Sequence, residues 1–252
     1  MALRIGFDLD GVLADMDAAL REHSERLFGT ARGEAPPARN SEPADDSEEA
    51  ATMPAETPVV QLDLSVRQER QLWRHVSTVE NFWEGLQEIE AGAIVRLATL
   101  AHERAWEIIF LTKRPRTAGA TSQVQSQRWL EAKGFPLPSV FVVQGSRGRI
   151  AKALDLDIVV DDRPENCLDV ITESSARAIL VWRGSSEATA AQRLGIGTVS
   201  TVGECLDICE EIDARSRKQP GMLERVKRML SPSSYSSSKS LASPSTPSSS
   251  KS

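Results

Sequence analysis

The sequence has few cysteines and no strongly basic character, and each shortage excludes a class of protein. Its three cysteines are Cys167, Cys205 and Cys209, an odd number with no CxxC pair, so neither a disulfide framework nor a zinc site is indicated. The formal net charge is −6 at pH 7, whereas proteins that bind a nucleic-acid backbone usually carry a basic surface. We therefore expect small buried cysteines in a reducing cytoplasm, and no nucleic-acid polymer as a partner.

Long apolar runs and the motif of serine hydrolases are missing as well. No apolar run approaches the length of a membrane span, and the first residues, MALRIGFD, lead directly into an apolar segment. These features predict neither a signal peptide nor a membrane span. There is no GxSxG, and His23, His75 and His102 all fall in helical patterns, which disfavours a Ser-His-Asp hydrolase.

The chain does contain a regular alternation of short apolar runs with helical patterns. With 252 residues, 40% of them hydrophobic, it is long enough for one good core. The runs are nearly continuous in apolar residues, as expected for strands covered on both faces. Strand followed by helix, repeatedly, predicts an α/β fold with a doubly wound parallel sheet. The expected strands are Ile5–Phe7, Glu107–Leu111, Val140–Val143, Ile158–Val160, Ala178–Val181 and Thr198–Ser200.

One interval is too long for a crossover between neighbouring strands. Residues 15–91 show helical patterns and no convincing strand, so we expect a small helical cap inserted after the first strand of a core formed by residues 1–14 and 92–214. Inside the cap, residues 32–58 are rich in Pro, Ala, Glu and Ser. That composition predicts a disordered acidic insertion.

The C-terminal part has a different composition from the core. Residues 215–230 predict a basic amphipathic helix, which docks on its own domain, on a partner or on an acidic membrane surface; we favour the first. Residues 231–252 are a Ser/Pro/Lys-rich tail for which we expect disorder.

The first expected strand ends in two carboxylates. The stretch IGFDLDG places Asp8 and Asp10 where the strand meets its loop, and Gly11 marks a sharp turn. Two partly desolvated carboxylates repel each other unless a proton or a cation lies between them. A divalent metal satisfies this requirement best.

The later strand ends carry a matching set of polar side chains. Thr112 and Lys113 follow the second run, GSRGRIAK leads to Lys152 at an expected helix start, and Asp161 with Asp162 ends the run at Ile158–Val160. Open parallel sheets bind ligands at the carboxyl ends of their strands. Each residue alone fits a helix cap or a solvated surface position, but together they favour an anionic substrate held with a metal.

The order DLDGVLAD, FLTKRP, a lysine and VVDDRPENC resembles the motifs of the haloacid dehalogenase-like superfamily of phosphatases, over about residues 3–182. The resemblance implies a nucleophile at Asp8, a general acid/base at Asp10, phosphate binding by Thr112 and Lys152, and Mg²⁺ binding by Asp8, Asp10, Asp161 and Asp162. An aspartyl-phosphate divides one difficult displacement into two easier ones. The resemblance also implies that dehalogenases lack an acid at position 10, so the acid favours phosphate-ester hydrolysis.

Within the superfamily, DLDGVLADMDAAL, NFWEGLQEIEAGA and DIVVDDRPENC are most similar to the 5′(3′)-deoxyribonucleotidase-like branch. Phe82 and Trp83 match its aromatic stretch, where they stack a nucleobase or pack the core of the cap. Lys113 and Arg114 stand where the branch has a small Ser-Pro-like segment. These cations clamp a second phosphate or balance the late acidic pair. We expect Lys113, Phe82 and Trp83 to contribute to substrate binding.

Two other functions remain open at this stage. A phosphatase of a non-nucleotide metabolite, such as a sugar phosphate or phosphoglycolate, uses the same core and differs in its cap. A non-catalytic interaction protein on the same scaffold is a further alternative, although the complete set of polar residues argues against it. The sequence leaves the oligomeric state open. It also leaves open which of Asp161 and Asp162 ligates the metal directly, since successive strand residues point to opposite sides.

Overall fold

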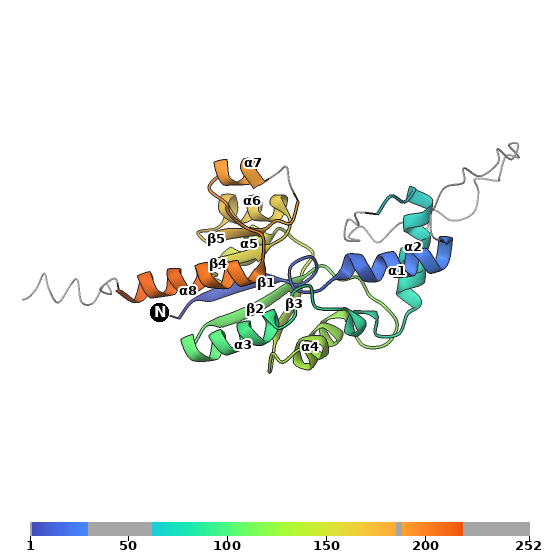
Figure 1. The fold of residues 1–252 in the computed structure, drawn as a ribbon, viewed down its shortest axis with the longest axis horizontal. Helices are drawn as coiled ribbons and strands as arrows, with labels where there is room; N and C mark the ends of the chain where they lie inside the picture. Colours follow the sequence, from blue (N-terminus) through green and yellow to red (C-terminus); the bar gives the residue numbers. More distant parts are fainter. Residues whose placement is uncertain (1, 30–61, 185–187, 219–252) are drawn as a thin grey trace, which may run out of the picture. The chain divides into compact units, whose positions relative to one another are not determined.

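The structure is a computed structural model, and it describes residues 2–29, 62–184 and 188–218. A sheet of six parallel strands in the order β3-β2-β1-β4-β5-β6 forms its centre (Figure 1). This confirms the predicted doubly wound parallel fold, and every expected strand is present within about two residues of its predicted bounds. The strands are β1 (Arg4–Asp8), β2 (Glu107–Thr112), β3 (Ser139–Val142), β4 (Ile158–Asp161), β5 (Arg177–Val181) and β6 (Gly197–Val199).

Helices occupy the intervals between the strands. Those described between β1 and β2 are α1 (Met16–Phe28), α2 (Val66–Thr78), the 3₁₀ turn η1 (Phe82–Gly85) and α3 (Ala93–Arg104). The later ones are α4 (Ser122–Ala132), α5 (Arg147–Ala153), α6 (Pro164–Glu173), α7 (Ala188–Arg193) and α8 (Val202–Lys218). Side-chain caps start several of them: Ser65 forms a capping box with Gln68, and the Thr121 hydroxyl accepts from the Val124 amide. Such caps fix where a helix begins.

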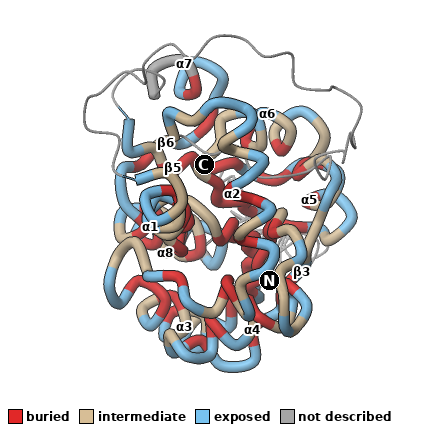
Figure 2. The backbone as a smooth tube through the Cα atoms, turned by 90° about the vertical axis from the view of Figure 1, so that its right-hand side faces the viewer, coloured by how far each residue is buried: buried red, intermediate tan, exposed pale blue. Residues whose placement is uncertain are grey.

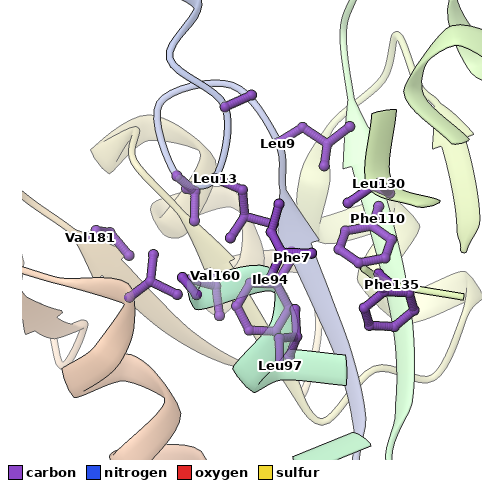
Figure 3. Packing of buried hydrophobic residues seen from close by; sticks show 14 of the residues in the cluster. Phe7, Leu9, Leu13, Ile94, Leu97, Phe110, Leu130, Phe135, Val160 and Val181 are labelled. Carbon is purple, nitrogen blue, oxygen red and sulfur yellow. The ribbon is translucent and has the colours of Figure 1, made fainter. Parts of the chain in front are cut away.

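The period-two pattern of the strands divides the buried residues into two layers. Phe7, Phe110 and Val160 point to one face, where they pack with residues of α3, α4 and α8 (Figure 3). Leu111 and Val159 point to the other face and pack with α5, α6 and α7. Because successive strand residues face opposite sides, strands covered on both faces must be apolar throughout, as the sequence indicated.

Strand order locates the edge at which a ligand is expected. From β1 the chain first adds β2 and β3 on one side, then returns to place β4 on the other side of β1. The order reverses between β1 and β4, and in open parallel sheets the crevice outside the carboxyl ends at such a reversal is the usual ligand site. Asp8 and Asp161 are the last residues of these two strands.

The buried residues of the helices between β1 and β2 belong to the same hydrophobic cluster as those of the sheet. In α2, Leu72, Trp73 and Val76 are buried, and His23 of α1 lies beside His75 of α2 with ring nitrogens 3.0 Å apart. Buried and exposed residues alternate along the helices (Figure 2). Trp73 therefore packs in the hydrophobic core.

Several predictions fall on residues that the structure does not describe: the insertion at 32–58, residues 219–230 of the expected basic helix, and the tail at 231–252. The described part of the chain contains no helix that combines the length and the apolar character needed to cross a membrane. All three cysteines are free and buried, as predicted. The proposed boundaries of core and cap stay a prediction.

Candidate active site at the carboxyl edge of the sheet

Three carboxylates meet where the strand order reverses. Asp8 ends β1, Asp161 ends β4, and Asp162 follows it; each offers an oxygen within 4.8 Å of the others. Burial, the Asp161 charge and Asp162 raise the pKa of Asp8 well above its ordinary value, although Arg147 opposes this. Burial and the neighbouring Asp161 raise the pKa of Asp162 to about 7, and burial also raises that of Asp161. The raised values reflect chiefly the burial of the three carboxylates, and repulsion by Asp161 adds to it at Asp8 and Asp162.

This donor set fits a hard divalent cation. Mg²⁺ takes oxygen ligands at about 2.0–2.1 Å, so oxygens on opposite sides of the ion lie roughly 4 Å apart. The three oxygens lie within 4.8 Å of one another, and a cation would offset both the cost of burying these charges and the repulsion that Asp161 exerts on Asp8 and Asp162. Asp10, which was also predicted as a metal ligand, does not belong to the cluster among the described residues, because its carboxylate is turned to other partners.

Gly11 allows the loop after β1 to pass over the cluster. Its φ is +82°, and a Cβ at this position would overlap the carboxylate of Asp162. A residue other than glycine would therefore meet both backbone strain and a collision. Because Gly11 has no Cβ, the Asp162 carboxylate can pack directly against the loop that follows β1.

Arg147 supplies the cation at the centre of the cluster. It is the first residue of α5, directly after the cap Ser146, and only 2% of its surface is exposed. Its Nη2 donates to the Asp8 carboxylate and its Nε lies 3.3 Å from Asp161 Oδ2. Its Nη1 is buried and has no hydrogen-bond partner among the described residues. A buried unpaired guanidinium nitrogen beside a cavity is a donor suited to an oxygen of a bound anion.

The structure contradicts the predicted position of Lys152. The helix begins at Arg147, not near Lys152, so Lys152 lies in the last turn of α5 and is exposed. Five helical residues correspond to a rotation of about 140° from Arg147, which directs the lysine away from the sheet edge. Of the cations in GSRGRIAK, Arg147 contacts the carboxylates of Asp8 and Asp161, whereas the prediction named Lys152. The serine that caps the helix, immediately before Arg147, was the available signal.

Asp10 is held by a buried arginine and by Thr112. Arg114 Nη2 donates to Asp10 Oδ1 at 2.8 Å and its Nε to Oδ2 at 3.0 Å, and the Thr112 hydroxyl donates to Oδ2 at 3.1 Å. The guanidinium carbon lies 5.0 Å from the Trp83 ring centroid, and Nη1 donates to Ser126. Arg114 therefore balances Asp10, not the late acidic pair or a second phosphate. The fully buried Thr112 contacts Asp10, which differs from its predicted contact with phosphate.

Phe82 and Trp83 do not form an aromatic wall for a substrate. Both are buried, at 5% and 0% exposure, and their rings pack edge to face at 4.9 Å. Trp83 Nε1 donates to the Pro115 carbonyl at 3.0 Å, and its amide donates to the Gln125 side chain. The pair attaches η1 to α4 and to the segment after β2. The prediction that they stack a base is wrong for this structure, because neither ring has a free face.

A cavity of about 330 Å³ opens beside the carboxylates. The half-buried Lys113 and the buried Arg147 are among the cations that line it, and Asp8 borders the same space. Lys113 thus borders the cavity, and its predicted part in substrate binding stays a prediction. The other lining residues include Asp10, Met16, Asp17, Asp162, Arg163, Asn166 and Trp182.

Comparison with known proteins gives a fold. No family model and no curated protein matches the sequence. A Thermotoga maritima protein assigned as a beta-phosphoglucomutase is 16% identical, with a TM-score of 0.52 over 83% of this chain and 99% of that one. A haloacid dehalogenase (HAD) family hydrolase of Deinococcus radiodurans, with bound phosphate and sodium, is 14% identical, with a TM-score of 0.51 over 83% and 96%. The chain has the haloacid dehalogenase-like fold.

That fold is the one the motifs resembled, and its first strand carries Asp8. The narrower resemblance, to the deoxyribonucleotidase-like branch, loses its main support, because the HAD-like fold is shared by many hydrolases and the aromatic pair is buried.

Proposed function

We propose that this protein is a metal-dependent phosphomonoesterase of the haloacid dehalogenase-like superfamily, acting on a small phosphorylated metabolite. The observation that carries the proposal is the meeting of Asp8, Asp161 and Asp162 with Arg147 at the reversal of strand order, beside a cavity that Lys113 also lines. Carboxylates gathered around a cation site, with cationic side chains that line the same space, suit a phosphate group.

In the proposed reaction, an Asp8 oxygen attacks phosphorus and the bond from phosphorus to the ester oxygen breaks. Water then attacks the aspartyl-phosphate, which releases inorganic phosphate and restores the carboxylate. Arg147, through its unpaired Nη1, and Lys113 hold the non-bridging oxygens as charge shifts toward them. Asp10 borders the cavity and is the group placed to carry the proton between leaving oxygen and water.

A divalent cation held by Asp8, Asp161 and Asp162 would reduce the repulsion between the nucleophile and an anionic phosphate. Mg²⁺ is our proposal for this ion, because the ligands are all carboxylate oxygens.

The burial of Phe82 and Trp83 alters the choice of substrate class. The nucleoside monophosphate prediction relied on these rings as a stacking surface, and the structure uses them for packing. We therefore favour a non-nucleotide metabolite such as a sugar phosphate, and keep a nucleoside monophosphate as the second candidate.

The direct test is phosphate release from a panel of phosphate esters, with Mg²⁺ and with EDTA. We expect turnover that EDTA abolishes and Mg²⁺ restores, and loss of that turnover in Asp8→Asn, since an amide does not replace the nucleophile. The matched control is Asp155→Asn: this aspartate is exposed and has a φ of +51°, a conformation that asparagine adopts readily. Equal turnover by Asp8→Asn and Asp155→Asn would refute the proposed mechanism.

A further inference from the structure

A second cavity, of about 420 Å³, adjoins the first. Both are bordered by Gly11, Met16, Asp17, Asp162 and Trp182. A phosphate bound near Asp8 would therefore have its remaining ester group directed along residues that the second cavity shares. Together the two spaces fall in the size range of pockets for small molecules.

Trp182 differs from the other tryptophans of the chain. Trp73, Trp83, Trp106 and Trp129 are all buried at 5% exposure or less, whereas Trp182 is half-buried and borders both cavities. It follows β5 directly, and a Cβ on residue 184 would lie 3.0 Å from its ring carbon Cζ2. Gly184 therefore lets the backbone pack closely against the indole, which holds the ring in place beside the cavities.

The second cavity offers hydrogen-bond acceptors and no available cation. Asp15 and Asp17 line it, and burial together with the Asp15 charge raises the pKa of Asp17. Arg183 is the one cation among the described lining residues. Its guanidinium donates to the Gly11 carbonyl at 2.6 Å and to Glu90 Oε1 at 2.8 Å, so its charge is already compensated. A second anionic group entering here would face Asp15 and Asp17, whereas Arg21, which lowers the pKa of Asp17, does not line the cavity.

No described residue donates a hydrogen bond to the Asp17 side chain, which is half-buried. A carboxylate accepts from hydroxyl groups in up to four directions, and a half-buried acceptor gains from a donor that replaces water. The flat apolar face of an indole beside such an acceptor matches a group that is apolar on one side and hydroxylated at its edge.

We propose that the second cavity binds the leaving group of the substrate, and that this group is neutral and rich in hydroxyls, as a sugar is. Trp182 contacts its face and Asp17 accepts its hydroxyl hydrogens. This assignment rests on the proposed phosphatase function, and it disfavours substrates with a second anionic group, such as phosphoglycolate.

The test compares a hexose phosphate with acetyl phosphate, whose leaving group is too small to extend into the second cavity. The quantity measured is the ratio of their kcat/KM values in Trp182→Leu and in the matched control Trp106→Leu. Trp106 is also a tryptophan with a buried Nε1 that has no partner among the described residues. It directly precedes β2 and so lies at the amino ends of the parallel strands, whereas Trp182 lies at their carboxyl ends. We expect Trp182→Leu to lower the ratio by roughly tenfold and Trp106→Leu to leave it unchanged.

Asp17→Asn adds a readout that a purely structural role would not produce. Removing the carboxylate should lower the ratio of kcat/KM for hexose phosphate to that for acetyl phosphate, because a hydroxyl acceptor is lost. It should raise kcat/KM for phosphoglycolate relative to acetyl phosphate, because a repulsive charge disappears. An unchanged hexose ratio in Trp182→Leu, with acetyl phosphate turnover that depends on Asp8, overturns the inference and leaves the phosphatase function standing.

A binding measurement distinguishes the subsite proposal from the phosphatase proposal when the subsite is right and the phosphatase function is wrong. Hexose phosphate is titrated into Asp8→Asn protein by calorimetry, with and without Trp182→Leu. Binding that requires Trp182, if the unmodified protein turns over no ester, supports the subsite and overturns the phosphatase function. Tighter binding of a nucleoside monophosphate or of phosphocholine than of hexose phosphate overturns the sugar assignment.

Discussion

At the residue scale, two cations of α5 have different surroundings although both belong to GSRGRIAK. Arg147 contacts Asp8 and Asp161 and is buried, whereas Lys152 is exposed in the last turn. Because only Arg147 reaches the proposed phosphate position, we expect Arg147→Ala to lower kcat/KM by about 10²-fold, as loss of a donor to developing charge typically does.

The matched variant is Lys152→Ala, for which we expect turnover within about twofold of the unchanged protein, as for a surface substitution. Arg147→Lys keeps the charge but not the two-sided contact with the carboxylates, so its kcat/KM should lie between those of the other two variants. A loss in Lys152→Ala as large as that in Arg147→Ala would show that the lysine reaches the phosphate.

The sequence predicted the residue types of the site better than their individual contacts. Asp8, Asp161 and Asp162 come together because each follows a strand, and strand ends are easily recognised. Arg147 was not recognised as a site residue and Arg114 was assigned other partners than Asp10, because a cation close to a strand end has no sequence signature that says which carboxylate it will meet. That choice depends on helix phase and on burial, which only the packed structure defines.

At the scale of elements, η1 connects the segment before α3 to α4 through Trp83. The indole donates to Pro115, lies over Arg114 and is completely buried. We expect Trp83→Ala to destabilise the protein by about 3–5 kcal/mol, as for other large buried aromatics. Its kcat/KM should fall by the same factor for every substrate, because Arg114 holds Asp10 and Asp10 serves all of them.

This prediction is tested by thermal unfolding and by kcat/KM for a hexose phosphate, a nucleoside monophosphate and acetyl phosphate. Trp182→Leu is the contrasting variant, since it should change the ratios among these substrates. A selective loss of nucleotide turnover in Trp83→Ala, with unchanged stability, would restore Trp83 to a base-binding role.

Strands were easier to predict than the packing of aromatic residues, and the reason is physical. A strand covered on both faces must be apolar at every position, so β1, β2, β4 and β5 are visible as continuous runs. An aromatic residue satisfies a protein core and a ligand pocket equally well. The sequence therefore left Phe82 and Trp83 undecided between the two, and it gave no sign that the half-buried Trp182 borders the cavities.

At the scale of the whole molecule, strand order unites residues that lie far apart in the sequence. Asp8 is followed by the helices of residues 16–104 and by two further strands before the chain returns to place Asp161 beside it. The alternation of strands and helices predicted a doubly wound sheet, but β4 joins β1 only because the order reverses there. Because Asp8 and Asp161 end the paired strands β1 and β4, we expect the charge on these carboxylates to affect the stability of the folded protein.

The last prediction concerns this link between charge and stability. The pKa of Asp162 is about 7 in the folded protein, far above that of an unfolded carboxyl, about 4. Between these values the folded chain binds more protons than the unfolded chain, so the free energy of unfolding falls as pH rises toward 7. Asp8 and Asp161 shift in the same direction. In EDTA we therefore expect a lower Tm at about pH 8 than at about pH 5.5.

Mg²⁺ should reverse this trend, because a cation binds the ionised carboxylates and stabilises the folded state by mass action. Its effect on Tm should be small at about pH 5.5 and larger at about pH 8. Asp162→Asn removes one titrating carboxyl and one ligand, so it should weaken both the pH dependence in EDTA and the stabilisation by Mg²⁺. These effects are measured by thermal unfolding of the unmodified protein and of Asp162→Asn, each in EDTA and in Mg²⁺ at both pH values. A Tm in EDTA that rises between the two pH values, or an equal Mg²⁺ effect in Asp162→Asn, would mean that the three carboxylates are not the cation site.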